Sequence, residues 1–396
     1  MHIQQGTTAF RRMSLALFAG GFSTFAILYC LQPLMPEFTR DFGVAPAVAS
    51  LSLSMTTIAM SVAMLFVGSL SDAWGRKSIM ALSLLAASVM AVVIAFSPEF
   101  HTLLGLRILQ GIVLAGLPAI AMTYLTEEME PLSLGYAMGL YISGNSIGGM
   151  AGRIVTGLLT DWFDWRVAVA VLGCLSVAAA VIFYVMLPPS QHFRQRKLEI
   201  GKVIPLLWAQ CRNPRLLCLY GLGFLLMGSF VTLFNYIGYE LLAAPYYLSQ
   251  SLVGSIFVVY LMGTVSSTWM GRLSDRFGRG GVMRAALCIV LAGALLTLGG
   301  SLALKIIGMA IFTFGFFGAH SIASSWVGIV AQADKAQASA LYLFFYYIGS
   351  SVSGTSGGLV FTRYGWDGVI GMIAIYFVLA MLLSTVLNRR SLDAQT

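Results

Sequence analysis

Apolar stretches of about 20 residues recur along the chain, and they constrain its fold more than any other feature. Each is long enough to cross roughly 30 Å of hydrocarbon as an α-helix. Lipid offers no hydrogen-bond partner to an exposed backbone N–H or C=O group, so helices are the required form. The sequence predicts twelve spans, near 14–36, 47–70, 79–97, 102–126, 134–159, 166–187, 216–240, 249–270, 282–300, 303–329, 338–361 and 367–387. We therefore expect an all-α integral membrane protein.

The charges of this chain are few and unevenly distributed. Only 10% of its 396 residues are charged, whereas a soluble domain carries about 25%. With a cytoplasmic N-terminus, the cytoplasmic loops and ends would hold Arg11, Arg12, Arg76, Lys77, Arg194, Arg196, Lys197, Lys202, Arg272, Arg276, Arg279, Arg284, Arg389 and Arg390. The other side would hold Arg40, Arg166, Lys305 and Arg363. This positive-inside pattern predicts that both termini are cytoplasmic. The net charge of +8 thus reports topology, and no nucleic-acid partner is expected.

One long polar segment, 188–215, divides the spans into two sets of six. We expect a six-helix bundle in 1–187, a cytoplasmic linker in 188–215 and a second bundle in 216–396. After the second span of each set stands a similar phrase, "GSLSDAWGRK" from Gly68 and "GRLSDRFGRG" from Gly271, 203 residues later. Internal repeats of this kind predict two pseudo-symmetric bundles with a substrate site between them near the membrane midplane.

Further positions agree with this repeat. At the same offset Gln32 aligns with Asn235, and Glu37 aligns with Glu240. In the fifth and eleventh spans "YISGNSIGGMAGR" aligns with "YYIGSSVSGTSGG", which pairs Tyr141 with Tyr346. Several matches in register are difficult to explain by chance.

Two of these motifs carry a family resemblance. The loop "GSLSDAWGRKSIM" resembles the signature loop of the major facilitator superfamily, and "LLGLRILQGIVLAG" (103–116) resembles its second motif, which includes Arg107. The resemblance covers the whole chain and is closest to twelve-helix drug/proton antiporters and related bacterial exporters. It implies proton-coupled export of small organic molecules or drugs by alternating access. It also implies a monomer without a cofactor in the bacterial inner membrane, in contact with lipids.

One feature departs from the antiporter pattern. The glycine-rich fifth span "GNSIGGMAGR" lacks the usual Gly-Pro pair and adds Arg153. Proton-coupled uptake of a small nutrient, such as a sugar or an organic acid, therefore stays open as an alternative.

The resemblance implies that the repeated loop latches one bundle against the other. The residues expected to do this are Gly68, Asp72, Gly75, Arg76 and Lys77 in the first copy and Gly271, Asp275, Gly278 and Arg279 in the second. The alternative is a loop that only ends a helix and satisfies the positive-inside bias. The doubling of the motif favours the latch.

Four charged or titratable residues are candidates for proton coupling. Arg107 lies inside an apolar span, where a charge is costly and is kept facing a bundle interior or cavity; the alternative is a hydrogen-bonding hub. His320 is the one histidine inside a span, and its side chain titrates near neutral pH; a buried neutral histidine is at least as common. Glu37 and Glu240 lie near outer helix ends, where simple solvation is the competing explanation.

Polar residues on the spans are candidates for substrate contact: Gln32, Asn235, Tyr236, Asn145, Tyr141 and Arg153. Arg153 suits an anionic group of the substrate, or a structural pair with a carboxylate. Other classes find less support. The sequence has no G-x-x-x-x-G-K-[ST] phosphate loop for an ATP-driven pump, and the spans contain no paired carboxylates, nucleophile elbow or metal-ligand spacing for a membrane-embedded enzyme. We expect neither catalysis nor a bound metal.

Overall fold

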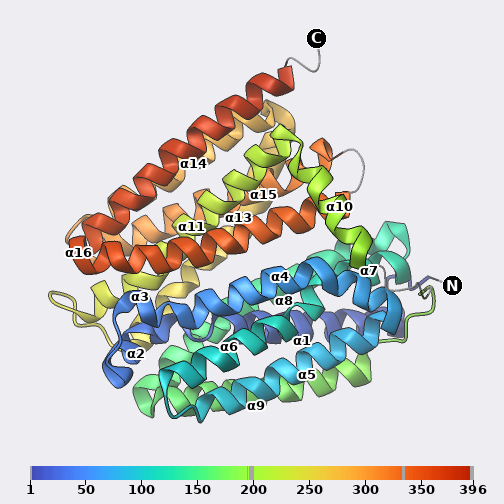
Figure 1. Ribbon diagram of the computed structural model, residues 1–396, viewed down its shortest axis with the longest axis horizontal. Coiled ribbons are helices and arrows are strands. Elements are labelled where there is room, and N and C mark those ends of the chain that lie inside the picture. Colours follow the sequence, from blue (N-terminus) through green and yellow to red (C-terminus); the bar gives the residue numbers. More distant parts are fainter. Residues whose placement is uncertain (1, 194, 196–199, 332–334, 393–396) are drawn as a thin grey trace. The chain divides into compact units, whose positions relative to one another are not determined.

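The computed structural model describes residues 2–193, 195, 200–331 and 335–392, and helices dominate throughout this part (Figure 1). Its extended pairing is the isolated parallel bridge between Ile3 and Met129. The predicted all-α fold is confirmed. The helices are α1 (Thr8–Tyr29), η1 (Gln32–Leu34), α2 (Met35–Phe42), α3 (Pro46–Ala49), α4 (Leu51–Trp74), α5 (Arg76–Ala95), α6 (Phe100–Leu114), α7 (Gly116–Glu128), α8 (Pro131–Trp162), α9 (Trp165–Met186), α10 (Ile200–Cys211), α11 (Pro214–Leu242), α12 (Gln250–Ser255), η2 (Ile256–Tyr260), α13 (Leu261–Phe277), α14 (Arg279–Leu296), α15 (Leu302–Val330) and α16 (Lys335–Leu392).

Ten helical segments of the described chain are long and apolar enough to cross a membrane. One of them, within α16, covers two of the predicted spans, which are separated by a non-helical residue, Gly365 (φ 60°, ψ −152°). The helix α8 is absent from the ten because Gly, Ser and Asn residues lower its mean hydropathy. With these two adjustments the helices account for the twelve predicted spans.

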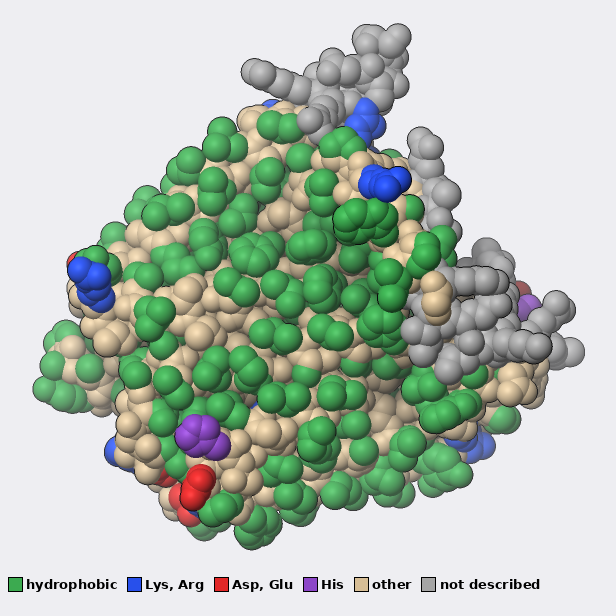
Figure 2. All heavy atoms as spheres, in the orientation of Figure 1, with side chains coloured by type: hydrophobic (Ala, Val, Ile, Leu, Met, Phe, Trp, Pro, Cys, Tyr) green, Lys and Arg blue, Asp and Glu red, His purple; other side chains and the backbone are tan. Residues whose placement is uncertain are grey.

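Side-chain caps fix the starts of several spanning helices. Asp164 accepts a hydrogen bond from Val167 N at the start of α9, and Ser301 accepts one from Leu304 N at the start of α15. Such caps satisfy backbone N–H groups that a helix end leaves without partners. Hydrophobic side chains cover most of the visible molecular surface, and charged side chains lie near its margins (Figure 2). This is the distribution expected of a protein that faces lipid.

The chain folds as two compact units. Unit 1 comprises residues 1–38, 55–200 and 249–255, and unit 2 comprises 39–54, 201–248 and 256–396. Each unit comprises most of one half of the sequence together with a short segment of the other half. The linker also contains a helix, α10, that the sequence analysis did not anticipate.

In unit 1, α1 packs along α8, and α5 packs along α9 (Figure 1). The α1–α8 contact depends on glycine. A Cβ atom at Gly144 would lie 2.6 Å from Phe18 O, and one at Gly152 would lie 2.7 Å from the Cα atom of Ala26. Close approach of helix backbones at small residues is the usual way in which membrane helices pack.

In unit 2, α11 packs along α16 in the same manner. A Cβ atom at Gly349 would clash with Phe224 O, as one at Gly144 would clash with Phe18 O in unit 1. Phe230 lies at the centre of an aromatic cluster, and its ring centroid is 4.0 Å from that of Phe316. The equivalent glycine contacts show that the sequence repeat is also a structural repeat.

The exchanged segments are held by different chemistry. In unit 1, Asp161 at the end of α8 accepts hydrogen bonds from Gln250 N (3.0 Å) and Ser251 N (2.9 Å) at the start of α12. Partial burial opposes ionisation, but these hydrogen bonds hold the pKa of Asp161 below its ordinary value. In unit 2, Ser54 and Ser351 exchange hydrogen bonds from each Oγ to the other's carbonyl oxygen, at 3.2 and 3.0 Å. One segment is therefore tied by a carboxylate and the other by neutral groups.

Candidate functional site

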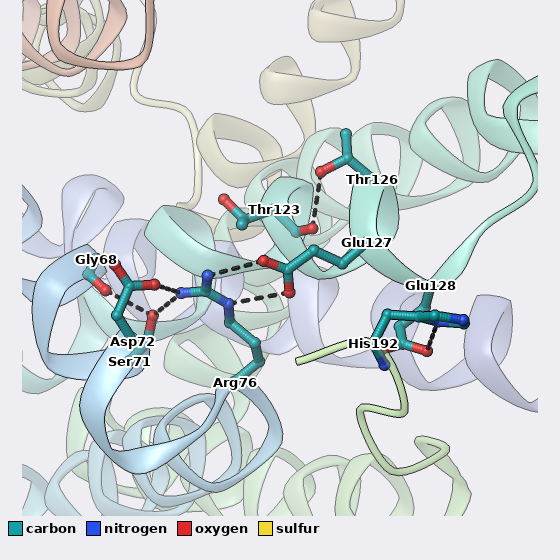
Figure 3. A network of polar contacts seen from close by, with 9 residues as sticks. All are labelled: Gly68, Ser71, Asp72, Arg76, Thr123, Thr126, Glu127, Glu128 and His192. Carbon is teal, nitrogen blue, oxygen red and sulfur yellow. Dashed lines mark hydrogen bonds and ion pairs between the residues drawn. The ribbon is translucent and has the colours of Figure 1, made fainter. Parts of the chain in front are cut away.

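The first copy of the loop motif forms a buried polar network (Figure 3). The Arg76 side chain is 9% exposed, and its Nη1 lies 2.5 Å from Asp72 Oδ1. From the other side, Nη2 and Nε donate to the two carboxylate oxygens of Glu127 at 2.8 and 3.2 Å. Ser71 accepts a further hydrogen bond from Nη1 at 2.5 Å. This bidentate geometry matches the planar guanidinium to a carboxylate, and it joins α4, α5 and α7.

Glycine at position 75 makes this geometry possible. Its φ of 97° places it between α4 and α5 in a conformation that side chains other than glycine rarely adopt. Gly278 has the equivalent place in the second copy, with φ 84°. A Cβ atom at Gly68 would meet no heavy atom of the described chain within 4 Å, so close packing does not require glycine there. At Gly271 the nearest atom, Ser321 Oγ, is 3.9 Å away.

Among the residues that the structure describes, the second copy forms no such network. Arg279 Nη2 lies 3.2 Å from Asp275 Oδ1, and these side chains are 31% and 71% exposed. This is a local pair between residues four apart, and such exposed pairs contribute little to stability. The two copies therefore share a backbone and differ in their side-chain contacts.

Lys77 has a different environment from Arg76. Its Nζ donates to Leu187 O at 2.6 Å and lies 5.2 Å from the centroid of the Tyr184 ring. Next to the network, the nearly buried carboxylate of Glu128 accepts from His192 N (2.9 Å) and lies 3.1 Å from His192 Nδ1 (Figure 3). Charges at this end of unit 1 thus tie the segment after α9 to α5 and α7.

Arg107 is fully buried on α6 and caps a helix end. Its Nη2 donates to Leu28 O at 2.9 Å, and its Nη1 donates to Ile27 O at 3.3 Å and to Gln110 Oε1 at 2.6 Å. Because α1 ends at Tyr29, these carbonyls lack the partners that a continuous helix would give them. In this conformation Arg107 is a hydrogen-bonding hub, and its part in proton coupling stays a prediction.

Arg153 and Gln32 come together in unit 1. The buried Arg153 donates from Nε to Gln32 Oε1 at 2.7 Å and from Nη1 to Gly149 O at 2.5 Å. Its guanidinium carbon lies 4.2 Å from the centroid of the Tyr29 ring, which is a cation–π contact. A guanidinium is thus fixed where η1 interrupts the first predicted span, the kind of position that marks binding sites in transporters.

His320 lies in the aromatic cluster of unit 2. Its Nδ1 is 2.9 Å from Tyr342 Oη. Its ring stacks on that of Phe316, with centroids 6.0 Å apart, and lies at a tilt of 36° to that of Tyr346, with centroids 4.6 Å apart. The hydrogen-bonding partner Tyr342 belongs to another helix, α16. The neighbouring Ser321 of α15 is engaged elsewhere, because its Oγ donates to Ser267 O at 3.3 Å.

Glu240 forms an ion pair that the sequence analysis missed. Its Oε1 lies 2.9 Å from Lys305 Nζ, and the lysine side chain is 3% exposed. Lys305 Nζ also donates to Thr297 O and lies 5.3 Å from the centroid of the Trp366 ring. The Glu240 side chain, 27% exposed, is thus ion-paired as well as partly solvated, and its part in proton coupling stays a prediction. Glu37 is also buried, at 8% exposure.

The remaining polar candidates are mostly packed between helices. Tyr236 is fully buried and its hydroxyl donates to Gly354 O, and Asn235 Nδ2 lies beside the same glycine. In unit 1, Tyr141 is 2% exposed, and both Tyr141 and Asn145 lie against Gly21 of α1. Substrate contact by these residues stays a prediction.

The sequence analysis missed three participants: Glu127, Lys305 and Tyr342. Glu127 is one of two adjacent acids in "TEEME" at the end of a span, and that position was the available signal. Lys305 carried a signal too, as one of the few cations on the predicted outer side. No group of three or more His, Cys, Asp or Glu side chains in the described chain could hold a metal ion.

Comparison with known proteins gives consistent matches. The model of the Major Facilitator Superfamily matches residues 17–332. The uncharacterized MFS-type transporter YybF of Bacillus subtilis is 56% identical over 98% of this chain and 96% of its own length. The inner membrane transport protein YnfM of Escherichia coli is 48% identical over 98% and 93%. The multi-drug resistance efflux pump PmrA of Streptococcus pneumoniae is 26% identical over 95% and 96%. Together with the helical repeat, these matches show that the chain belongs to the major facilitator superfamily of membrane transporters.

Proposed function

We propose that this protein is a proton-coupled secondary transporter that exports small organic molecules by alternating access. It would act as a monomer in the bacterial inner membrane, with both termini cytoplasmic, no cofactor and no catalytic activity. The observation that carries the proposal is the Arg76 network, which clamps α4, α5 and α7 with an almost fully buried cation. A strong charge network at a loop that joins two spanning helices suits a contact that forms in one state and breaks in another.

The exchanged segments support the alternating part of the proposal. Gln250 and Ser251 come from the second half of the sequence but bind Asp161 of the first half. Ser54 of the first half binds Ser351 of the second. Hydrogen bonds of this kind can break in one state and re-form in another. We propose that they open when the transporter changes the side from which its site is accessible.

Proton coupling is supported by His320. Protonation would place a cation between the rings of Phe316 and Tyr346, whose π-faces stabilise it. Tyr342 Oη, 2.9 Å from Nδ1, would then accept the added proton in a hydrogen bond. The cost of burying the charge makes the protonated state depend on its surroundings, which is how a buried histidine can link proton binding to a conformational change.

Export of organic molecules is supported by the relative named as a multi-drug resistance efflux pump. Arg153, held by Gln32 and Tyr29, would favour substrates that carry a negatively charged or strongly polar group. The absence of proline between Gly144 and Gly152 keeps uptake as the second candidate, because the proline of antiporters stands in this stretch.

Inverted membrane vesicles provide the test. Vesicles with and without the protein are energised with an acid interior, and a panel of organic anions and lipophilic drugs is added one at a time. We expect an exported compound to release protons from the vesicle, seen as recovery of a quenched pH-sensitive dye, and to accumulate inside. The His320→Ala variant should lose the coupling. Accumulation that persists after a protonophore collapses the gradient would contradict proton coupling, and loss of internal compound upon energising would indicate uptake.

A further inference from the structure

An apolar groove lies on the surface of unit 1. It has a volume of about 440 Å³ and lies between α5 and α9. Its lining residues are Ser78, Ala81, Leu82, Leu85, Ala180, Val181 and Tyr184. Leu82 and Val181 are more than half exposed. From Ser78 to Leu85 the groove follows α5 for about 10 Å, a part of one membrane leaflet.

Two cations converge at one end of this groove. Lys77 Nζ donates to Leu187 O at 2.6 Å, and Arg12 Nη2 donates to Val185 O at 3.0 Å. The two acceptors are two residues apart, at the C-terminal end of α9. Lys77 also lies over the ring of Tyr184, which lines the groove. Both cations are therefore at the mouth of the apolar surface.

Neither Arg12 nor Lys77 forms an ion pair with a carboxylate in the described chain, where both bind neutral carbonyls. Partial negative charge at the helix C-terminus stabilises them only in part. Two neighbouring like charges at a membrane surface repel each other, so an anion shared between them is favourable. The charge of the site is complementary to a phosphate group.

We propose that the α5–α9 groove is a binding site for an anionic phospholipid, with the phosphate at Arg12 and Lys77 and one acyl chain along Leu82, Leu85 and Val181. The order of these groups along the groove is that of a lipid: the charge of Lys77 on α5 first, with the amphipathic ring of Tyr184 on α9 beside it, and then aliphatic side chains of both helices. The positive-inside pattern places this end in the cytoplasmic leaflet, whose anionic lipids attract basic residues. A bound lipid would bridge α1, α5 and α9.

We expect no equivalent lipid site at the second copy of the loop. Where the first copy has Lys77, the second has Gly280, so the repeat supplies no lysine at the equivalent position. Arg272 and Arg276 are exposed cations of that second copy and serve as a control of equal charge.

Native mass spectrometry of the full-length protein tests the proposal. The protein is mixed with equal amounts of phosphatidylglycerol and phosphatidylcholine that carry identical acyl chains. We expect the wild type to retain phosphatidylglycerol preferentially. In R12Q/K77Q this preference should fall about fivefold for each cation removed, or roughly 25-fold in all, whereas R272Q/R276Q should keep it.

A second variant separates the groove from the charges. In V181W a larger side chain on the exposed groove wall should displace the acyl chain and lower the binding of both lipids, with Arg12 and Lys77 intact. Equal retention of the two lipids by the wild type, or an unchanged preference in R12Q/K77Q, would overturn the proposal. So would undiminished binding in V181W. If V181W instead dissociated a dimer, the groove would be a contact between two copies of the chain. If the double variant does not fold, R12Q alone can be measured, because Arg12 is exposed. Its preference for phosphatidylglycerol should fall about fivefold.

Discussion

The two copies of the repeated loop have the same backbone turn, but the side chains that follow the turn make different contacts. Each has a glycine of positive φ between two spanning helices, Gly75 in one and Gly278 in the other. In the first copy the following arginine is buried between Asp72 and Glu127. In the second it is a third exposed and pairs with Asp275 four residues before it. The turn is thus present in both copies, whereas within the described part of the chain the charge network is found in the first copy.

This difference separates the glycine, which the turn itself requires, from the arginine, which forms contacts with another helix. Glycine is needed wherever the chain must turn with positive φ, so it occurs in both copies. A buried arginine is needed only where a third element presents a carboxylate, and in unit 1 that element is α7. The first copy is therefore the stronger candidate for the latch, and four predictions test this asymmetry.

Replacing Arg76 should have the largest effect. R76A leaves Asp72 and Glu127 without their cation, and breaking a fully buried pair costs about 3–5 kcal/mol. Because both acids keep partial exposure, we expect a loss of about 2–3 kcal/mol in the free energy of unfolding, together with most transport. Thermal unfolding in detergent measures the first and vesicle accumulation the second. If R76A were as stable and as active as the wild type, the claim that the Arg76 network distinguishes the first copy would be contradicted.

Removing the charge of Glu127 should have an intermediate effect. E127Q keeps one hydrogen-bond acceptor for Arg76 but loses the bidentate charge pair. Charge-assisted hydrogen bonds are about twice as strong as neutral ones, so we expect a loss of about 1–2 kcal/mol by thermal unfolding. The adjacent E128Q is the matched control, since Glu128 binds His192 and not Arg76. The same transport defect in both variants would argue against a specific role of Glu127.

Replacing either turn glycine by alanine should destabilise the protein by a similar amount in the two copies. G75A and G278A both force a side chain into positive φ, at a cost of roughly 1–2 kcal/mol each. No heavy atom of the described chain lies within 4 Å of a Cβ at Gly278, and Ser78 Oγ alone lies at that limit at Gly75. Backbone strain should therefore dominate, and the two variants should unfold at similar temperatures. A much larger effect of either one would show that the turns are not equivalent.

The smallest effect is expected for Arg279. R279A removes one exposed pair, and such pairs contribute about 0–1 kcal/mol. Stability should change by less than about 0.5 kcal/mol, and raising the salt concentration should reduce even that. Unfolding curves at low and high salt measure both. A loss comparable to that of R76A would mean that the second copy acquires an equally strong network in another state.

The fold could be predicted from the sequence because lipid restricts the choices. Length and hydropathy predicted the spans, and the repeat is the basis of the prediction of two bundles. The sequence did not predict that 39–54 and 249–255 would each belong to the unit formed by the other half of the chain. This exchange involves hydrogen bonds between residues far apart in the sequence, such as Ser54 with Ser351 and Asp161 with Gln250. Short polar contacts of this kind leave no periodic pattern in a sequence.

The candidate site was predictable in part. The motif identified Asp72 and Arg76, because a repeated phrase with charges is conspicuous in an apolar chain. It did not identify Glu127, which belongs to another helix and becomes a partner only when α7 ends beside α5. Similarly, Glu240 carried no sign of its pairing with Lys305, 65 residues away. Individual candidate residues could be identified from the sequence, whereas their interaction partners could be identified only from the structure.

Transport rates of R76A and R279A in the same vesicle preparation test the central claim most directly. The two variants remove the same side chain from equivalent positions, and rates are normalised to the amount of folded protein. We predict that R76A loses at least about 90% of the pH-driven accumulation, while R279A keeps most of it. Equal rates for the two variants would contradict the claim that the first copy, with Glu127, is the latch of the transporter.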